Sequence, residues 1–408
     1  MFGDFEAQRH WMEITYNLPP REWYVNSINN DLSYWGLDYP PLTAYHSYLM
    51  GLVANHINSS WVSLRSSRGL ETVRHKLFMR LTAVVPFYIV YAPAIIYFNS
   101  MFALILTYPG LLAIDNAHFQ YNSISLGLFV FSLLFLENQR FLLGSIFFVM
   151  ALNYKQMELY HALPVFVFIF ARSLKRPLGR NIVSLVVSLA FVLLWLPFVV
   201  NGPQAVLAVL GRLFPFYRGL YEDKVASIWC AFSFDSQNCS ALCVVLVTTP
   251  SLFLLFLRPT MKNFKLSLMI SSLAFFLFSF QVHEKSILLA AVYVFQLIIQ
   301  PNMFPLCLKD GTGLLLALFI AYYISCSLTI KPSGKLLLPI YHLSCLTAVA
   351  LCVIEWTLTP PARYPHIFPL FNAMYSCVHF IIFLSIQWNL SFISNEKPFN
   401  ILSFKEHT

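Results

Sequence analysis

Residues 181–200 read NIVSLVVSLAFVLLWLPFVV, an apolar run without a single charged side chain. A helix needs about 20 such residues to cross the hydrocarbon core of a bilayer, so this run predicts a membrane span. The rest of the chain has the same character, because 58% of its 408 residues are hydrophobic and only 11% are charged. Soluble domains carry about 25% charged residues. The sequence therefore predicts an all-α polytopic membrane protein.

Apolar runs of similar length recur on both sides of this one, without a soluble domain or a clear repeat between them. At the length that a bilayer requires, they predict about 11–13 transmembrane helices. The runs lie near residues 78–98, 101–115, 122–137, 141–153, 158–172, 181–200, 239–257, 264–282, 286–301, 311–330, 336–357 and 366–388. Residues 62–80, VSLRSSRGLETVRHKLFMR, are basic and amphipathic, and we expect them to lie at the membrane surface before the first span.

Two basic loops orient the spans. Residues 171–181 (ARSLKRPLGRN) and 257–265 (LRPTMKNFK) carry the densest runs of Lys and Arg, which favours the cytosolic side. The chain crosses the membrane twice between them, so the loop 201–238 faces the opposite, lumenal side. Counting outward, five polar segments fall on that same side: residues 1–45, 114–122, 153–161, 212–230 and 281–285. The net charge of +8 thus reflects membrane orientation, and no basic tract suggests nucleic acid as a partner.

The opening stretch, residues 1–45, is polar and aromatic in a chain that is otherwise apolar: MFGDFEAQRHWMEITYNLPPREWYVNSINNDLSYWGLDYPPLTAY. It holds six of the 18 acidic residues, interleaved with Trp and Tyr. Carboxylates accept hydrogen bonds from sugar hydroxyls, and flat aromatic faces stack on sugar rings. The pattern favours a sugar site, although a solvated loop remains the alternative. The acids are Asp4, Glu6, Glu13, Glu22, Asp31 and Asp38.

Each of the other polar segments has a functional and a structural interpretation. Residues 114–122 (IDNAHFQYN) could cap the end of a helix, and Lys155, Glu158 and His161 could form local ion pairs on one turn. QVHEK, residues 281–285, could be the end of a span. Ionisable groups at membrane depth are nonetheless functional more often than not. Cations at the membrane surface suit a phosphate group, and the candidates are Arg212, Arg218, Lys224, His283 and Lys285.

Several of these segments resemble one known family in sequence and in order. GDFEAQRHWMEIT and YWGLDYPPLTAYHS, followed by HFQYNS, NYKQMELYH, RLFPF and FLFSFQVHEKSILL, resemble the endoplasmic-reticulum dolichyl-phosphate-glucose:oligosaccharide-PP-dolichol α-1,3-glucosyltransferases, which add the first glucose. The resemblance is strong up to about residue 290. It implies a GT-C glycosyltransferase fold with lumenal loops, an active site in the first lumenal loop and a lipid-phosphate sugar donor. The sister enzymes that add the second glucose share DYPP but resemble the opening motif less.

The same resemblance implies roles for individual residues. The acid matching Asp4 looks like the general base, and the one matching Asp38 looks like a second essential acid. Donor glucose is β-linked and the product is α-linked, so the reaction inverts in one displacement, which needs one base and cations for the departing phosphate. No metal and no cofactor are expected. We expect substrate contacts from Glu6, Arg9, Trp35, His118, Gln120, Lys155, Arg218, Lys224, His283 and Lys285.

The expected partners are dolichyl-phosphate-glucose, the acceptor Man9GlcNAc2-PP-dolichol and the lipid bilayer. We divide the chain into residues 1–75, a first lumenal loop with catalytic acids and amphipathic helices, and residues 76–408, a multispan region that includes the lumenal loop 201–238. The sequon at Asn58 should face the lumen. Cys230 and Cys239 could pair or stay thiols. The family places a helix before the opening motif, so we expect this 408-residue chain to be a shortened gene model or isoform that is weakly active or inactive.

Two other classes of protein fit the composition. A transporter or channel also places ionisable groups among membrane spans, but it has no need of a long acidic and aromatic segment before the first span. An inverted repeat, which many transporters carry, is not visible in the sequence. A catalytically inactive scaffold subunit of a glycosylation complex is the other alternative.

Overall fold

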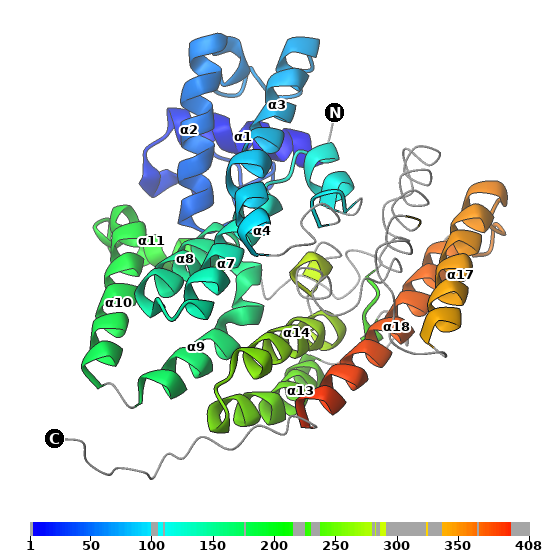
Figure 1. The fold of residues 1–408 in the computed structure, drawn as a ribbon. Helices are drawn as coiled ribbons and strands as arrows, with labels where there is room; N and C mark the ends of the chain where they lie inside the picture. Colours follow the sequence, from blue (N-terminus) through cyan, green and yellow to red (C-terminus); the bar gives the residue numbers. More distant parts are fainter. Residues whose placement is uncertain are drawn as a thin grey trace. The chain divides into compact units, whose positions relative to one another are not determined.

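The computed structural model describes residues 3–98, 105–108, 111–174, 177–214, 225–229, 237–279, 282, 286–290, 324, 337–364 and 367–392. Every regular element in these ranges is a helix, as Figure 1 shows. The prediction of an all-α protein is therefore confirmed for the described residues. The chain forms two compact units, the first made of Met1–Glu158 with Asn181–Tyr217 and the second of Leu159–Arg180 with Arg218–Thr408.

The first unit starts with two packed helices. Helix α1 (Asp4–Asn17) begins after Gly3, whose φ of 80° suits glycine, and it ends before two consecutive prolines. Helix α2 (Pro41–Ile57) opens with a proline at its first position, where the missing N–H has no partner to lose. The two helices approach closely at Gly51, where a Cβ atom would lie 2.8 Å from the carbonyl oxygen of Met12.

Helix α1 is buried on several sides. Trp11 and Ile14 belong to one apolar cluster, while Phe5 and Met12 belong to another. Its acidic and basic side chains Glu6, Arg9 and Glu13 are buried too, which is unusual for charged residues. The opening stretch is therefore not the solvated loop that the sequence left as an alternative, at least as far as α1 extends.

The remaining helices of the first unit pack around an antiparallel pair. Helices α7 (Asn122–Glu137) and α8 (Phe141–Tyr154) lie against each other, and α2 packs on α8. Helix α3 (Val73–Pro86) continues through a π-helical turn (Phe87–Tyr91) into α4 (Ala92–Phe98), and the turn and α4 pack on α7. Most of α10 (Pro177–Val199) and all of α11 (Pro203–Leu213) complete the unit.

Residues 62–80, which the sequence predicted to lie at the membrane surface, consist of a loop and the first part of helix α3. Residues 62–72 are turns and loop, with left-handed backbone at Arg65 and Gly69. Helix α3 starts only at Val73, where the side chain of Thr72 accepts a hydrogen bond from the backbone N–H of His75. The left-handed residues turn the chain before α3 begins, and the position of this stretch at the membrane surface stays a prediction.

The second unit is built on another helix pair. Helices α13 (Gln237–Leu257) and α14 (Met261–Phe278) pack against each other, and α9 (Leu159–Ser173) contacts both. The rings of Phe168 and Phe264 stack with centroids 4.2 Å apart. Helix α18 (Ile367–Phe392) packs on α14 and on α17 (Leu337–Thr357).

The predicted membrane spans correspond to helices wherever the structure describes them. Five are long and apolar enough to cross a bilayer by length and composition: Val73–Tyr97, Asn181–Val199, Cys239–Leu257, Met261–Phe278 and Leu370–Phe392. The predicted runs at 122–137, 141–153, 158–172 and 336–357 coincide with α7, α8, α9 and α17. Residues 291–301 of the run at 286–301, all of the run at 311–330 except residue 324, residues 101–104 and 109–110 of the run at 101–115, and Cys230 lie outside the described residues. The chain is a multi-pass membrane protein.

The close approach of α1 and α2 gives a test of the packing. Alanine usually stabilises a helix over glycine by about 1 kcal/mol. In the variant Gly51→Ala the new methyl would press on the backbone of Met12, so we expect a net loss of about 1–3 kcal/mol. Gly211→Ala on α11 is the matched control, because a Cβ atom added there would meet nothing within 4 Å. Thermal unfolding in detergent should rank Gly51→Ala below the wild type and Gly211→Ala at or above it. The reverse order would show that the helices are not packed this closely.

Candidate functional site

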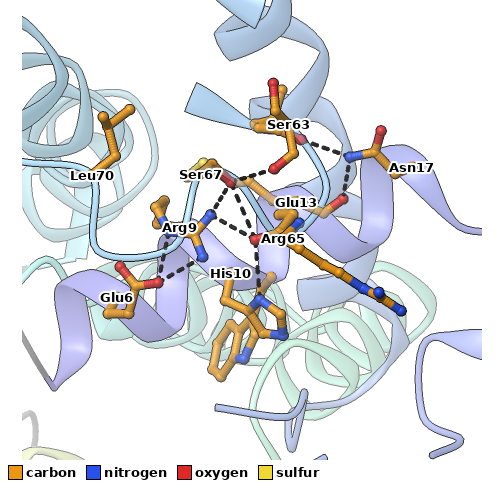
Figure 2. Close-up of polar contacts among 12 residues, drawn as sticks. Glu6, Arg9, His10, Glu13, Asn17, Ser63, Arg65, Ser67 and Leu70 are labelled. Atoms are coloured by element: carbon orange, nitrogen blue, oxygen red, sulfur yellow. Dashed lines mark hydrogen bonds and ion pairs between the residues drawn. The ribbon is translucent and has the colours of Figure 1, made fainter. Parts of the chain in front are cut away.

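A buried ionic cluster fixes helix α1 to a later loop (Figure 2). The guanidinium of Arg9 donates to Oε1 of Glu6 at 2.6 Å, to Oε2 of Glu13 at 2.7 Å and to Oγ of Ser67 at 2.5 Å. The spacing i, i+3 and i+7 places Glu6, Arg9 and Glu13 on one face of the helix. Ser67 belongs to the loop that precedes α3, so the cluster ties that loop to α1.

Glu13 receives the most contacts in the cluster. Its carboxylate also accepts from the backbone N–H of Arg65 at 2.6 Å and lies 3.2 Å from Nδ1 of His10. Burial raises the pKa of Glu13, but the hydrogen bond from His10 and the charge of Arg9 outweigh it and lower that pKa to about 2. Because the pKa of Glu13 is lower in the folded state than in the unfolded state, ionised Glu13 stabilises the folded protein. This contribution is fully present above the unfolded pKa of about 4.5 and is lost as the pH falls toward 2. Glu13 is therefore ionised at any physiological pH.

Tyr34 links this cluster to the segment Trp35–Tyr39, which carries Asp38. The hydroxyl of Tyr34 donates to Oε1 of Glu6 at 2.9 Å, and its ring lies under the guanidinium of Arg68 at 4.3 Å. Oε2 of Glu6 is buried and has no hydrogen-bond partner among the described residues. The ionic cluster thus holds the start of the site-bearing segment as well as the loop before α3.

All five backbone carbonyls of the segment Trp35–Tyr39 accept hydrogen bonds from side chains. Trp11 Nε1 donates to Trp35, and Gln156 Nε2 donates to Asp38. The five hydrogen bonds are Trp11 to Trp35 at 2.9 Å, Arg212 Nη2 to Gly36 at 2.8 Å, Arg212 Nε to Leu37 at 3.1 Å, Gln156 to Asp38 at 3.1 Å and the hydroxyl of Tyr24 to Tyr39 at 2.7 Å. The backbone that presents Asp38 is therefore fastened at every residue.

A buried lysine lies at the end of this segment. Lys155 follows α8, and its ammonium group donates to Oδ1 of Asn122 at 2.5 Å and to Oε1 of Gln120 at 3.3 Å. The ammonium also lies 4.5 Å from the centroid of the Tyr39 ring, within the range of a cation–π contact. Lys155 therefore brings a positive charge next to the residue that follows Asp38.

For Asp115 the structural interpretation holds. Its two carboxylate oxygens accept from the backbone N–H groups of Asn122 and Ser123 at 2.6 and 2.7 Å. These are the first N–H groups of α7, which have no partner inside the helix, and the negative charge is favourable at that end. Glu158 and His161 have partners on other helices, since Ser125 donates to Glu158 and Ser272 bonds His161.

The structure brings some of the predicted site residues together and places others elsewhere. Gln120 and Lys155 meet beside the segment that holds Asp38, while Trp35 on the same segment is 38% exposed. Asp4 is half-buried in the first turn of α1, and His118 is exposed. Glu6 and Arg9 belong to the buried ionic cluster. The others lie outside the described residues: Arg218, Lys224, His283 and Lys285.

Sequence reasoning did not find the residues that hold the segment. Arg212 was considered only as a cation for a phosphate, and the hydrogen-bonding roles of Trp11, Tyr24 and Gln156 were not foreseen. All are polar or amphipathic residues within segments that the sequence singled out. Their location in these segments could have marked them as candidates, but the sequence does not show which groups they bond. Among the described residues, no group of three or more His, Cys, Asp or Glu side chains is arranged to hold a metal ion.

Comparison with known proteins gives the same family over most of the chain. The family described as "ALG6, ALG8 glycosyltransferase family" matches residues 1–238 and 235–386. A Caenorhabditis elegans protein named "Probable dolichyl pyrophosphate Man9GlcNAc2 alpha-1,3-glucosyltransferase" is 50% identical over 97% of this chain and 84% of its own length. A Gallus gallus protein named "Dolichyl pyrophosphate Man9GlcNAc2 alpha-1,3-glucosyltransferase" is 40% identical over 97% of this chain and 92% of its own length.

A Dictyostelium discoideum protein with the same name as that of C. elegans is 42% identical over 76% of this chain and 69% of its own length. The matches include the opening stretch, the segment around Asp38 and the helices that hold both. Because they extend over nearly the whole sequence at this level of identity, the chain belongs to the ALG6, ALG8 glycosyltransferase family.

Proposed function

We propose that the protein transfers glucose from dolichyl-phosphate-glucose to Man9GlcNAc2-PP-dolichol and forms an α-1,3 linkage. The observation that carries this proposal is the identity of 40–50% over 97% of the chain with relatives that are named for this reaction. The family itself also contains sister enzymes, but the names of these relatives favour the first glucose over the second.

The chemistry requires two kinds of group at the site. A single inverting displacement requires a base that takes the proton of the acceptor hydroxyl, and such a base typically contributes about 100- to 10,000-fold to the rate. It also requires positive charge for the departing lipid phosphate. Asp4 is our proposed base and Asp38 the acid that orients the acceptor. His283 is our first choice for the phosphate, with Arg218, Lys224 and Lys285 as further cations.

The described geometry supports this assignment in part. Asp4 is half-buried at the start of α1, so part of the residue is accessible. Asp38 lies in a segment whose five successive backbone carbonyls all accept hydrogen bonds. A fixed backbone of this kind is what catalysis by orientation requires. The exposed indole of Trp35 offers a flat face to a sugar ring.

We place this site on the lumenal face of the endoplasmic-reticulum membrane, with its catalytic acids within residues 1–75. The basic loops at 171–181 and 257–265 support that sidedness, since Lys and Arg favour the cytosolic side. Asn58, in the predicted lumenal sequon, is exposed after α2, and its Oδ1 accepts from the backbone N–H and the hydroxyl of Ser60.

The acceptor assay separates the first-glucose reaction from its alternatives. Microsomes from cells that lack the endogenous activity and express this chain are given radiolabelled dolichyl-phosphate-glucose. Man9GlcNAc2-PP-dolichol and its monoglucosylated form are offered separately. We expect label on the first acceptor only. Label on the second acceptor only would identify a second-glucose transferase, and label on neither would favour a transporter or scaffold.

The role of Asp4 is tested by Asp4→Asn, which keeps the size of the side chain and removes its basicity. We expect glucose transfer to fall by about 100- to 10,000-fold, because the acceptor hydroxyl would lose its base. Expression and acceptor binding should stay close to those of the wild type. Asp31→Asn is a matched control, since Asp31 is exposed and its carboxylate accepts from the neighbouring Ser33 in the same turn. Turnover by Asp4→Asn within a few-fold of wild type would remove Asp4 as the base.

A further inference from the structure

The segment Trp35–Tyr39 is held in a way that loops seldom are. Its five consecutive carbonyls are bonded by donors from α1, from α11, from the short helix that follows α8 and from the loop that contains Tyr24. Backbone groups in loops usually bond to water or to near neighbours. Here Arg212 and Leu37 are 175 residues apart in the sequence.

The backbone that these bonds hold is strained. Trp35 has a φ of 52°, in the left-handed region that bulky side chains rarely adopt. Such a residue persists where the surrounding structure over-determines it, and strain of this kind gathers at functional sites. The carbonyls of Trp35 and Gly36 both accept hydrogen bonds, and these bonds hold Trp35 in its strained conformation.

Arg212 contributes two of the five hydrogen bonds to these carbonyls. Its guanidinium bonds two neighbouring carbonyls, those of Gly36 and Leu37, at 2.8 and 3.1 Å. Gly36 leaves the room for it, because a Cβ atom there would lie 3.0 Å from Nη2 of Arg212 and 2.7 Å from the carbonyl oxygen of Leu32. The rigid, planar fork of donors in a guanidinium fits two neighbouring acceptors in one fixed geometry, whereas an ammonium group is a point charge on a flexible stem.

The helix that carries Arg212 is itself anchored beside the segment. Val209 and Leu213 on α11 are buried in the same apolar cluster as Leu37 and Tyr24. Leu37 is fully buried, so the residue before Asp38 is fixed by its side chain and by its carbonyl. Arg212 therefore acts on Asp38 through one intervening residue.

We propose that Arg212 is a positioning residue, which holds the backbone of Gly36 and Leu37 so that Asp38 and Trp35 are presented to the sugar substrates in one geometry. This inference rests on the proposed glucose transfer, and it assigns Arg212 a role other than binding the donor phosphate. Displacement of a reacting group by about 1 Å can lower a rate by about 100-fold. The loss should fall on kcat, because the donor's own contacts stay in place.

The test uses the 408-residue chain and the variants Arg212→Lys and Arg212→Ala, with dolichyl-phosphate-glucose as the donor. We expect both variants to lose about 100-fold in kcat while the donor KM changes by less than about 3-fold. Lysine should not rescue, because its ammonium is a point charge on a flexible stem and does not reproduce the planar fork that meets both carbonyls in one fixed geometry. Hydrogen exchange of the peptide that contains residues 32–41 should speed up in both variants, and this readout does not depend on activity.

Two further variants keep the result interpretable. Tyr24→Phe removes only the hydroxyl that bonds the carbonyl of Tyr39, so it loosens the same segment with a smaller change and should lower kcat by a smaller factor. Arg21→Lys is the matched control, because the side chain of Arg21 is 66% exposed, and it should behave as the wild type.

The alternatives give other patterns. A phosphate-binding Arg212 would raise the donor KM, and lysine would restore much of the activity. A purely structural Arg212 would lower the yield or the melting temperature while the activity per folded molecule stayed normal. Either pattern, or unchanged exchange of residues 32–41, would overturn the inference. An inactive wild type would instead reject the proposed function, and the exchange measurement would still decide whether Arg212 holds the segment.

Discussion

The buried guanidinium of Arg9 is the constraint on which the described first unit depends most. Removing a cation from water costs several kcal/mol, and only close, hydrogen-bonded acceptors offset that loss. Glu6, Glu13 and Ser67 supply them, and they come from α1 itself and from the loop before α3. Replacement of Arg9 by a neutral residue would leave the carboxylates of Glu6 and Glu13 buried without their cation, at a cost of about 3–5 kcal/mol. The burial of helix α1 on several sides therefore depends on the pairing of Arg9 with these carboxylates.

The same helix organises the candidate site. It carries Asp4 in its first turn, and two of its side chains hold the segment that leads to Asp38, Glu6 through Tyr34 and Trp11 through the carbonyl of Trp35. From there Arg212 and Gln156 fasten the following residues. The ionic cluster and the segment Trp35–Tyr39 are thus connected through α1. The buried ion pairs of Arg9 hold α1 in place, and α1 in turn holds the segment that carries Asp38.

Hydrophobic runs were enough to predict most of the described helices. The span expected at 239–257 coincides with Cys239–Leu257, because apolar composition over about 20 residues leaves a membrane helix few alternatives. Sidedness also suggested that residues 1–45, 114–122 and 153–161 would meet, and Lys155 does contact Asn122 and Tyr39. These predictions depend on local composition and on the number of membrane crossings between segments, and both can be read from the sequence.

Other features depend on contacts that a single sequence does not display. The spacing of Glu6, Arg9 and Glu13 on one helix face could have predicted their ion pairs, but burial of all three depends on Ser67. The hydrogen bond from Arg212 to the carbonyl of Leu37 joins two segments that are distant in the sequence. Composition could therefore predict only that Arg212 is a cation near the membrane surface, not which group it bonds. Backbone strain at Trp35 has no signal in its residue type, since tryptophan is disfavoured there.

The central claim is that the start of α1 and the segment Trp35–Tyr39 form one reaction site. It is tested most directly by an electron cryomicroscopy structure of the protein in lipid nanodiscs with a non-transferable analogue of dolichyl-phosphate-glucose. We expect the glucose density to lie within hydrogen-bond distance of the carboxylate of Asp4 or of Asp38, with the indole of Trp35 near the sugar. Ordered donor density away from both carboxylates would contradict the site proposed for this protein.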